Sequence, residues 1–150
     1  MNQAVQQTRN KGAFKAGEGA YLFQLAELEG IPGGAAYSTA FGSVVEGIHT
    51  QCGLMRKAAG TGARPHSHPN EQWNYVVKGR LRVSIAGEED RIVGPGTLIY
   101  FPPNVIHATV ALPEEDVLFF VVKDMSHGIE GIPADGKATG GYFEPGVTEG

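Results

Sequence analysis

Glycine and proline divide the sequence into short β-forming runs, and this spacing restricts the fold more than any other feature. The chain of 150 residues contains 22 glycines and 9 prolines, which are scattered along it and do not form repeats. Between them, runs rich in β-branched and aromatic residues recur about every 8–12 residues. Strands at this spacing indicate a single all-β domain, either a sandwich or a barrel, and not a fold of long helices.

Individual runs show how the strands should face. Leu81–Ile85 alternates strictly, as a strand buried on one face does. Val117–Lys123 is a continuous apolar run, which predicts a strand buried on both faces. From Val44 to Ala59 the pattern is also that of extended chain, with the apolar series Ile48, Cys52 and Leu54 on one face.

Three parts of one domain can be distinguished. Residues 1–43 are predicted to form an N-terminal arm and first strands, residues 44–124 the barrel, and residues 125–150 a tail or flap. Within the arm, residues 1–20 are polar, and Tyr21–Gly30 could form a short strand or a helical turn.

Charge and composition exclude several classes of partner. The net charge is −4 and the isoelectric point about 5.7. Since no cluster of Lys and Arg is present, we expect no nucleic-acid partner. No apolar run approaches the roughly 18 residues of a membrane span, and the N-terminal residues lack the apolar centre of a secretory signal. Cys52 is the single cysteine, so no internal disulfide can form. A cytoplasmic protein is expected.

Three histidines lie next to predicted strand ends. His66 and His68 are two residues apart, so in extended chain both imidazoles point to the same side. Gln72 follows at an even offset, whereas Glu71 points the other way. His107 would have to come from a neighbouring strand. Three imidazoles and one oxygen would suit a divalent first-row metal, although a pair of solvated loop histidines is the simpler interpretation of His66 and His68 taken alone.

The longer pattern around these histidines resembles the cupin superfamily. The spacing of the first cupin motif is reproduced, with Gln in the position of the usual Glu. The matching residues are Gly60, then after five residues His66, Ser67 and His68, then after three residues Gln72, and after six more Gly79. The stretch "VGPGTLIYFPPNVIHA", which ends just after His107, resembles the second motif, although Thr97 stands where Asp is frequent. The resemblance covers about residues 44–122.

This resemblance implies a jelly-roll β-barrel with a metal held by His66, His68, Gln72 and His107. It also implies a homodimer, in which residues 1–20 and Tyr21–Leu25 could extend to a partner's sheet. Gln72 offers only a neutral carbonyl oxygen, so a divalent metal would keep its full charge and attract anionic substrates. Fe2+ is favoured, and Ni2+, Zn2+, Mn2+ and Cu2+ suit the same ligands.

The leading functional hypothesis is an Fe(II)-dependent dioxygenase that cleaves a C–C bond of a small chelating enol, phenol or diketone. The alternatives are a non-redox isomerase or lyase acting on a carbonyl or uronate-like substrate, and a non-catalytic small-molecule-binding cupin. Three further residues are candidates for the pocket. Asn74 should face the cavity, Arg56 could anchor a substrate carboxylate, and Tyr100 could act as an acid or hydrogen-bond donor, although a packed aromatic is the simpler interpretation of Tyr100.

Overall fold

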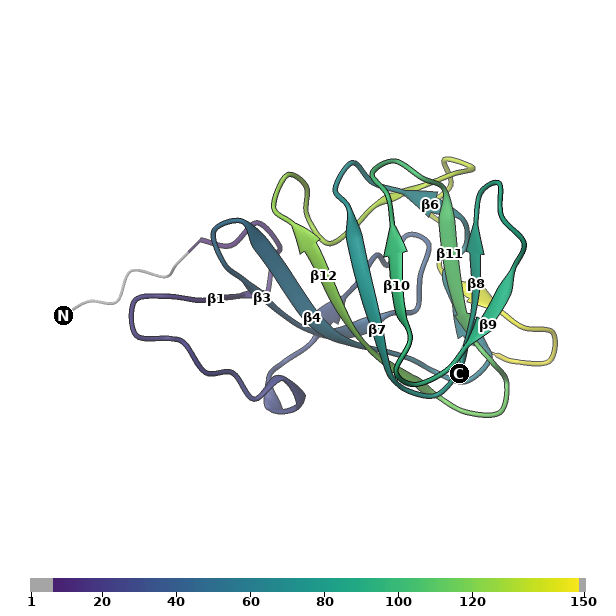
Figure 1. Cartoon of the computed structure of the whole chain (residues 1–150), viewed down its shortest axis with the longest axis horizontal. Coiled ribbons are helices and arrows are strands. Elements are labelled where there is room, and N and C mark those ends of the chain that lie inside the picture. The colour runs from purple at the N-terminus through teal and green to yellow at the C-terminus, as the bar shows by residue number, and fades with distance from the viewer. Residues whose placement is uncertain (1–6, 149–150) are drawn as a thin grey trace.

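Two β-sheets face each other and form a barrel (Figure 1). The computed structural model describes residues 7–148. This architecture confirms the all-β class predicted from the strand spacing and the jelly-roll barrel implied by the cupin resemblance. The first sheet contains, in spatial order, β1 (Phe14–Lys15), β3 (Phe41–Glu46), β4 (Thr50–Lys57), β12 (Val117–Asp124), β7 (Gln72–Lys78) and β10 (Leu98–Phe101), and β2 (Ile31–Pro32) also pairs with β3.

The second sheet carries two of the three candidate metal-binding histidines, His66 and His107. Its central strand is β11, which pairs in an antiparallel manner with β5, β6 and β8. In spatial order it contains β13 (Ile132–Pro133), β6 (His66–Ser67), β11 (His107–Ala111), β5 (Thr61–Gly62) and β14 (Tyr142–Phe143), with β8 (Leu81–Ile85) and β9 (Arg91–Val93) extending from β11.

Side chains of the first sheet alternate between the barrel interior and its outer face. In β4 the buried positions are Gln51, Gly53, Met55 and Lys57, so the apolar series that contains Leu54 faces outward. The alternation was predicted correctly, but the apolar series was wrongly taken as the inner one. The reason is that the inner face holds a polar site, whereas the outer face of this sheet is apolar.

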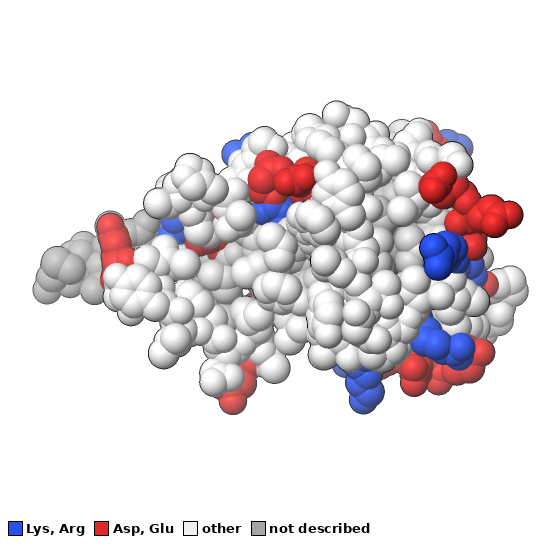
Figure 2. All heavy atoms as spheres, in the orientation of Figure 1, with Lys and Arg blue, Asp and Glu red and all other residues white. Residues whose placement is uncertain are grey.

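The outer face of β7 and β10 is unusually apolar. Trp73, Tyr75 and Val77 on β7 and Leu98 and Tyr100 on β10 are each 38–58% exposed. Figure 2 shows that the molecular surface over these strands is mostly uncharged. The neighbouring strand β12 is fully buried only on its inner face, because Leu118, Phe120 and Val122 are partly exposed. The prediction that this strand is buried on both faces was therefore wrong.

The hydrophobic core fills the barrel between the sheets. Its most deeply buried members come from both sheets and are packed at close to zero exposure, as a strand interior with alternating side chains requires. They are Val44, Met55, Val76, Leu81, Phe101, Ala111, Val117 and Phe119.

The N-terminal segment is bound to the first sheet of its own chain. Phe14 and Lys15 pair in parallel with β3, and the fully buried carboxylate of Glu46 accepts hydrogen bonds from the backbone N–H groups of Arg9 and Asn10. Of the two alternatives for Tyr21–Gly30, the structure has the helical turn, because η1 (Leu25–Glu27) is a short 3-10 helix that follows an irregular stretch. No strand forms at residues 21–25. The homodimer stays a prediction.

The C-terminal segment extends the second sheet. β13 pairs with β6, which carries His66, and β14 pairs with β5 on the other side of β11. The segment is held there by an ion pair between Arg82 and Glu144. Within residues 7–148 no helix has the length and apolar character needed to cross a bilayer.

Gly62 is required for the close approach of β5 to β11. A Cβ atom at this position would lie 2.3 Å from the carbonyl oxygen of Thr109, which is backbone and cannot rotate away. We expect Gly62→Ala to lower the free energy of unfolding by about 3 kcal/mol, measured by urea denaturation. Gly94→Ala is the matched control, because a Cβ there meets its nearest atom at an ordinary 3.7 Å. Equal stability of the two variants would contradict this account.

Candidate metal centre

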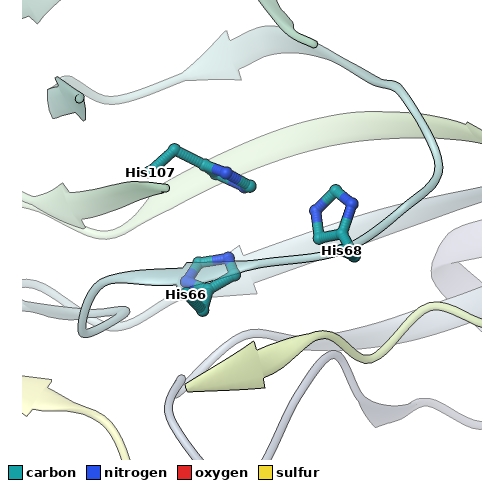
Figure 3. A group of neighbouring side chains, drawn as sticks. All are labelled: His66, His68 and His107. Carbon is teal, nitrogen blue, oxygen red and sulfur yellow. The ribbon is translucent and has the colours of Figure 1, made fainter. Parts of the chain in front are cut away.

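The pairing of two short strands brings three histidines together (Figure 3). His66 begins β6 and lies directly opposite His107, the first residue of β11. His68 follows β6, and its side chain returns to the same side as that of His66. The three rings are buried, and one nitrogen atom from each lies within 4.8 Å of the others. The i, i+2 pattern of the sequence therefore places both imidazoles inside the barrel, where His107 meets them.

Backbone carbonyl groups determine which nitrogen of each ring is free. The Nδ1 atom of His66 donates to the carbonyl oxygen of Arg64, at 2.8 Å. His68 Nδ1 donates to Asn70 at 2.8 Å, and His107 Nδ1 to Val105 at 2.9 Å. Because a carbonyl oxygen can only accept, the proton must be on Nδ1 in all three neutral rings. Each Nε2 then carries a lone pair, the form in which an imidazole binds a metal.

Aromatic neighbours hold two of the rings in place. Tyr37 stacks on His66 with ring centroids 4.0 Å apart, and Phe101 stacks on His107 at 4.2 Å. The hydroxyl of Tyr37 accepts a hydrogen bond from the backbone N–H of Gly131, so the C-terminal segment fixes this ring. Stacking and the Nδ1 hydrogen bonds together leave the imidazoles little freedom to rotate.

Burial keeps the three imidazoles neutral. It is the main cause that lowers the pKa of His66 to about 2, that of His68 to about 4 and that of His107 to about 3. A secondary cause is mutual repulsion, from His107 on His66 and from Lys123 on His68. Neutral rings with free lone pairs are ready to bind a cation without first releasing a proton.

Gln72 supplies an oxygen near the same point. It begins β7, and its Nε2 group donates to Asn74 Oδ1 at 2.7 Å. This bond directs the amide nitrogen away and leaves Gln72 Oε1 buried without a hydrogen-bond partner. Asn74, which is 2% exposed, therefore orients the amide of Gln72. Glu71 points outward and accepts a hydrogen bond from the hydroxyl of Tyr100.

His66, His107 and Gln72 line one small cavity. Its volume is about 40 Å³, which is space for roughly three water-sized groups. None of its lining residues is acidic. The lining consists of Gly33, Tyr37, Ser38, Ala40, Met55, Lys57, Ala63, His66, Gln72, Asn74, Phe101, His107, Thr109, Phe119, Val121, Lys123 and Ile129.

Two predicted pocket residues lie outside this cavity. The side chain of Arg56 is 67% exposed and forms an ion pair with Asp116. Tyr100 is on the outer face of β10, where its ring packs against Trp73. Both predictions were wrong for the same reason. Each residue alternates with an inward one, and the inward neighbours are Lys57 and Ile99 or Phe101.

Among the cavity residues that the sequence did not predict, three contribute polar or aromatic side chains next to the donors. Lys57 and Lys123 are 3% and 4% exposed, and Tyr37 is 1% exposed. The alternation of side chains along each strand could have indicated that both lysines face inward. Lys57 shares a face with Met55, and Lys123 shares a face with Phe119 and Val121. No local pattern predicts Tyr37, which reaches His66 from a loop far away in the sequence.

The donor set fits a divalent metal. The Nε2 atoms of His68 and His107 and the Oε1 atom of Gln72 are buried acceptors without a hydrogen-bond partner. Such groups are costly unless something binds them. Within residues 7–148, the three histidines are the one group of His, Cys, Asp and Glu side chains close enough to hold a metal ion. His66, His68 and His107 could hold the ion, with Gln72 Oε1 as a fourth ligand.

The fold, the motif spacing and the three-histidine site are those of a cupin domain. Residues 53–123, just under half of the chain, match the family model of the Cupin domain. This match confirms the cupin resemblance seen in the sequence.

Similar proteins include enzymes of different reaction types. A segment of 74 residues is 38% identical to oxalate decarboxylase OxdC of Bacillus subtilis (strain 168), and it covers 47% of this chain but only 19% of that protein. The structure of the S161A mutant of that decarboxylase is 26% identical with a TM-score of 0.57, covering 68% of this chain and 28% of the other. The DMSP lyase DddQ from Ruegeria pomeroyi DSS-3 is 19% identical with a TM-score of 0.55, covering 60% and 46% of the two chains, and this is a likeness of fold.

The buried imidazoles make the metal-free protein sensitive to acid. Unfolded histidine takes up a proton near pH 6.5, whereas the folded rings resist it down to about pH 4, 3 and 2. Protons therefore favour the unfolded chain, and the stability present above pH 6.5 is lost as the pH falls. Each ring contributes a loss of up to about 1.4 kcal/mol per pH unit.

We expect the free energy of unfolding of chelator-treated protein, measured by urea denaturation, to fall steeply between pH 6.5 and pH 4.5. His107→Gln should reduce this slope by up to about 1.4 kcal/mol per pH unit, the effect of one proton, since it removes one of the three rings. His49→Gln, at an exposed position, should leave the slope unchanged. A His107→Gln slope equal to that of the unmodified protein would refute the interpretation.

Proposed function

We propose that this protein is a metal-dependent cupin enzyme that acts on a small oxygenated anion by non-redox carbonyl or carboxylate chemistry, as a lyase, decarboxylase or isomerase does. The observation that carries the proposal is the buried set of neutral donors, His66, His68, His107 and Gln72, in a cavity without an acidic residue. A divalent metal bound there supplies Lewis-acid stabilisation of negative charge on a substrate oxygen.

The residues of the chain define which substrates can enter. The cavity has space for roughly three water-sized groups, so a small molecule or the end of a larger one fits. Phe101, Phe119 and Met55 form an apolar wall that excludes water and strengthens electrostatic interactions inside. With four neutral donors, no carboxylate competes with an anionic substrate for positive charge.

One observation favours the non-redox reaction over the dioxygenase. The 38% identical segment belongs to a protein named for the decarboxylation of oxalate, which is a small carboxylate. The Fe(II)-dependent dioxygenase remains the second candidate, favoured by the all-neutral donors and the apolar wall.

Metal content tests the site. We expect His66→Ala to lose bound metal, and Gln72→Ala to bind it at least about tenfold more weakly. Asn74→Ala should also weaken binding by about tenfold, because it frees the amide of Gln72 to rotate. The measurement is elemental analysis of purified protein, followed by competition with a chelator. Glu71→Ala, one residue away and facing outward, is the control. Full retention of affinity in Gln72→Ala would remove Gln72 from the site.

Dependence on oxygen separates the candidate reactions. The metal-loaded protein is incubated with a panel of small oxo-, hydroxy- and dicarboxylic acids, in air and under nitrogen, and products are followed by NMR. We expect equal turnover under both conditions, and no turnover by His66→Ala. Turnover that requires dioxygen and consumes it would establish the dioxygenase instead. Binding without turnover of any acid in the panel would favour the non-catalytic alternative.

A further inference from the structure

Two buried lysines reach the metal cavity from opposite ends of one strand pair. Lys57 ends β4, where it lies opposite Val117, and Lys123 lies near the end of β12, opposite Gln51. Both are on the inner face of the sheet and both line the cavity that contains His66, His107 and Gln72. Their exposed fractions of 3% and 4% mean that neither ammonium group reaches solvent along the barrel rim.

The hydrogen-bond partners of both ammonium groups in the described part of the chain are neutral. Lys57 Nζ donates to the carbonyl oxygen of Thr109 at 2.7 Å and to its hydroxyl at 2.6 Å. Lys123 Nζ donates to the carbonyl oxygen of Ile129 at 2.5 Å. An ammonium group has three N–H donors, so both lysines have donors to spare. Neither lysine forms an ion pair within residues 7–148, where the ion pairs are Arg56–Asp116, Arg64–Asp135 and Arg82–Glu144.

This arrangement is costly for folding. Lysine is almost never fully buried unless it is paired, because the charge loses its hydration. Burial lowers the pKa of Lys57 and of Lys123 to about 7, and for Lys123 the negative charge of Glu130 offsets only part of this effect. An apolar side chain would fill either position at less cost. Two such lysines in one cavity therefore point to a role in binding.

We propose that Lys57 and Lys123 form the anion-binding part of the cavity and that the substrate is a small carboxylate, with a dianion preferred over a monoanion. The inference rests on the proposed function, since it assigns the substrate class of the same site. Each ammonium group would donate charge-assisted hydrogen bonds to a carboxylate oxygen. Two cations beside four neutral donors, with no acid in the cavity wall, favour a ligand that brings two negative charges.

Binding of simple probes tests this without any knowledge of the reaction. Oxalate, acetate and acetamide represent a dianion, a monoanion and a neutral molecule of similar shape, and their affinities are measured by calorimetry on chelator-treated and on metal-loaded protein. We expect oxalate to bind more tightly than acetate in both forms, and acetamide to bind least. Equal affinities for oxalate and acetamide in both forms would overturn the proposal.

Substitutions assign the effect to the lysines. Lys57→Met and Lys123→Met keep the length of the side chain and remove the charge, and each should weaken oxalate binding by about tenfold or more. Lys78→Met, at an exposed position on β7, is the matched control. Thermal unfolding followed by circular dichroism verifies the fold, and Gln replaces Met where a Met variant unfolds. Unchanged oxalate affinity in folded variants of both lysines would overturn the assignment.

Metal content, measured on the same proteins, separates the two hypotheses. The lysine variants should bind metal as the unmodified protein does, because Lys57 and Lys123 are not among its donors. If the unmodified protein binds no metal but binds oxalate through the lysines, the metal-dependent function fails and the anion site stands. If metal binds and the lysine variants bind oxalate normally, the anion site fails and the metal centre stands.

Discussion

The pairing of β6 with β11 is the contact on which the site depends. It sets His66 opposite His107, and the i, i+2 alternation then adds His68 to the same interior. The neighbouring pairing of β5 with β11 is possible because Gly62 carries no Cβ atom to meet the backbone of Thr109. β6, a strand of two residues, and the start of β11 thus position the imidazoles, and the first sheet contributes Gln72 and closes the cavity.

The barrel interior is a compromise between a core and a site. One part is an apolar core built around Met55, Val76 and Phe119, and the other contains three imidazoles, two amides and two ammonium groups. Burial holds the imidazoles neutral and lowers the pKa of both lysines, so the cavity offers lone pairs suited to a cation and N–H donors suited to an anion. A metal with an anionic substrate would bind both kinds of group at once. That is the physical basis for treating this cavity as a binding site and not as an irregular part of the core.

The donor pattern was predictable because strand parity is local. Residues two positions apart in extended chain point to the same face. This rule predicts from the sequence alone that Gln72, and not Glu71, shares a face with the histidines. It also placed Asn74 inside, although its partner there proved to be Gln72. The same rule could not say which face of β4 is the inner one. Hydrophobicity pointed to the face that contains Leu54, and the structure has that face outside, which removes Arg56 from the cavity and brings Lys57 in.

The sequence by itself determined the all-β class, the cupin motif spacing and the alternation of each strand, since these follow from turn residues and from the period of two. Only the tertiary structure decided which alternate faces meet. That choice depends on sheet pairing between distant segments, such as β12 between β4 and β7, and on the apolar outer face of β7 and β10. The buried lysines and the stacking of Tyr37 on His66 arise from the same long-range packing, which no local pattern encodes.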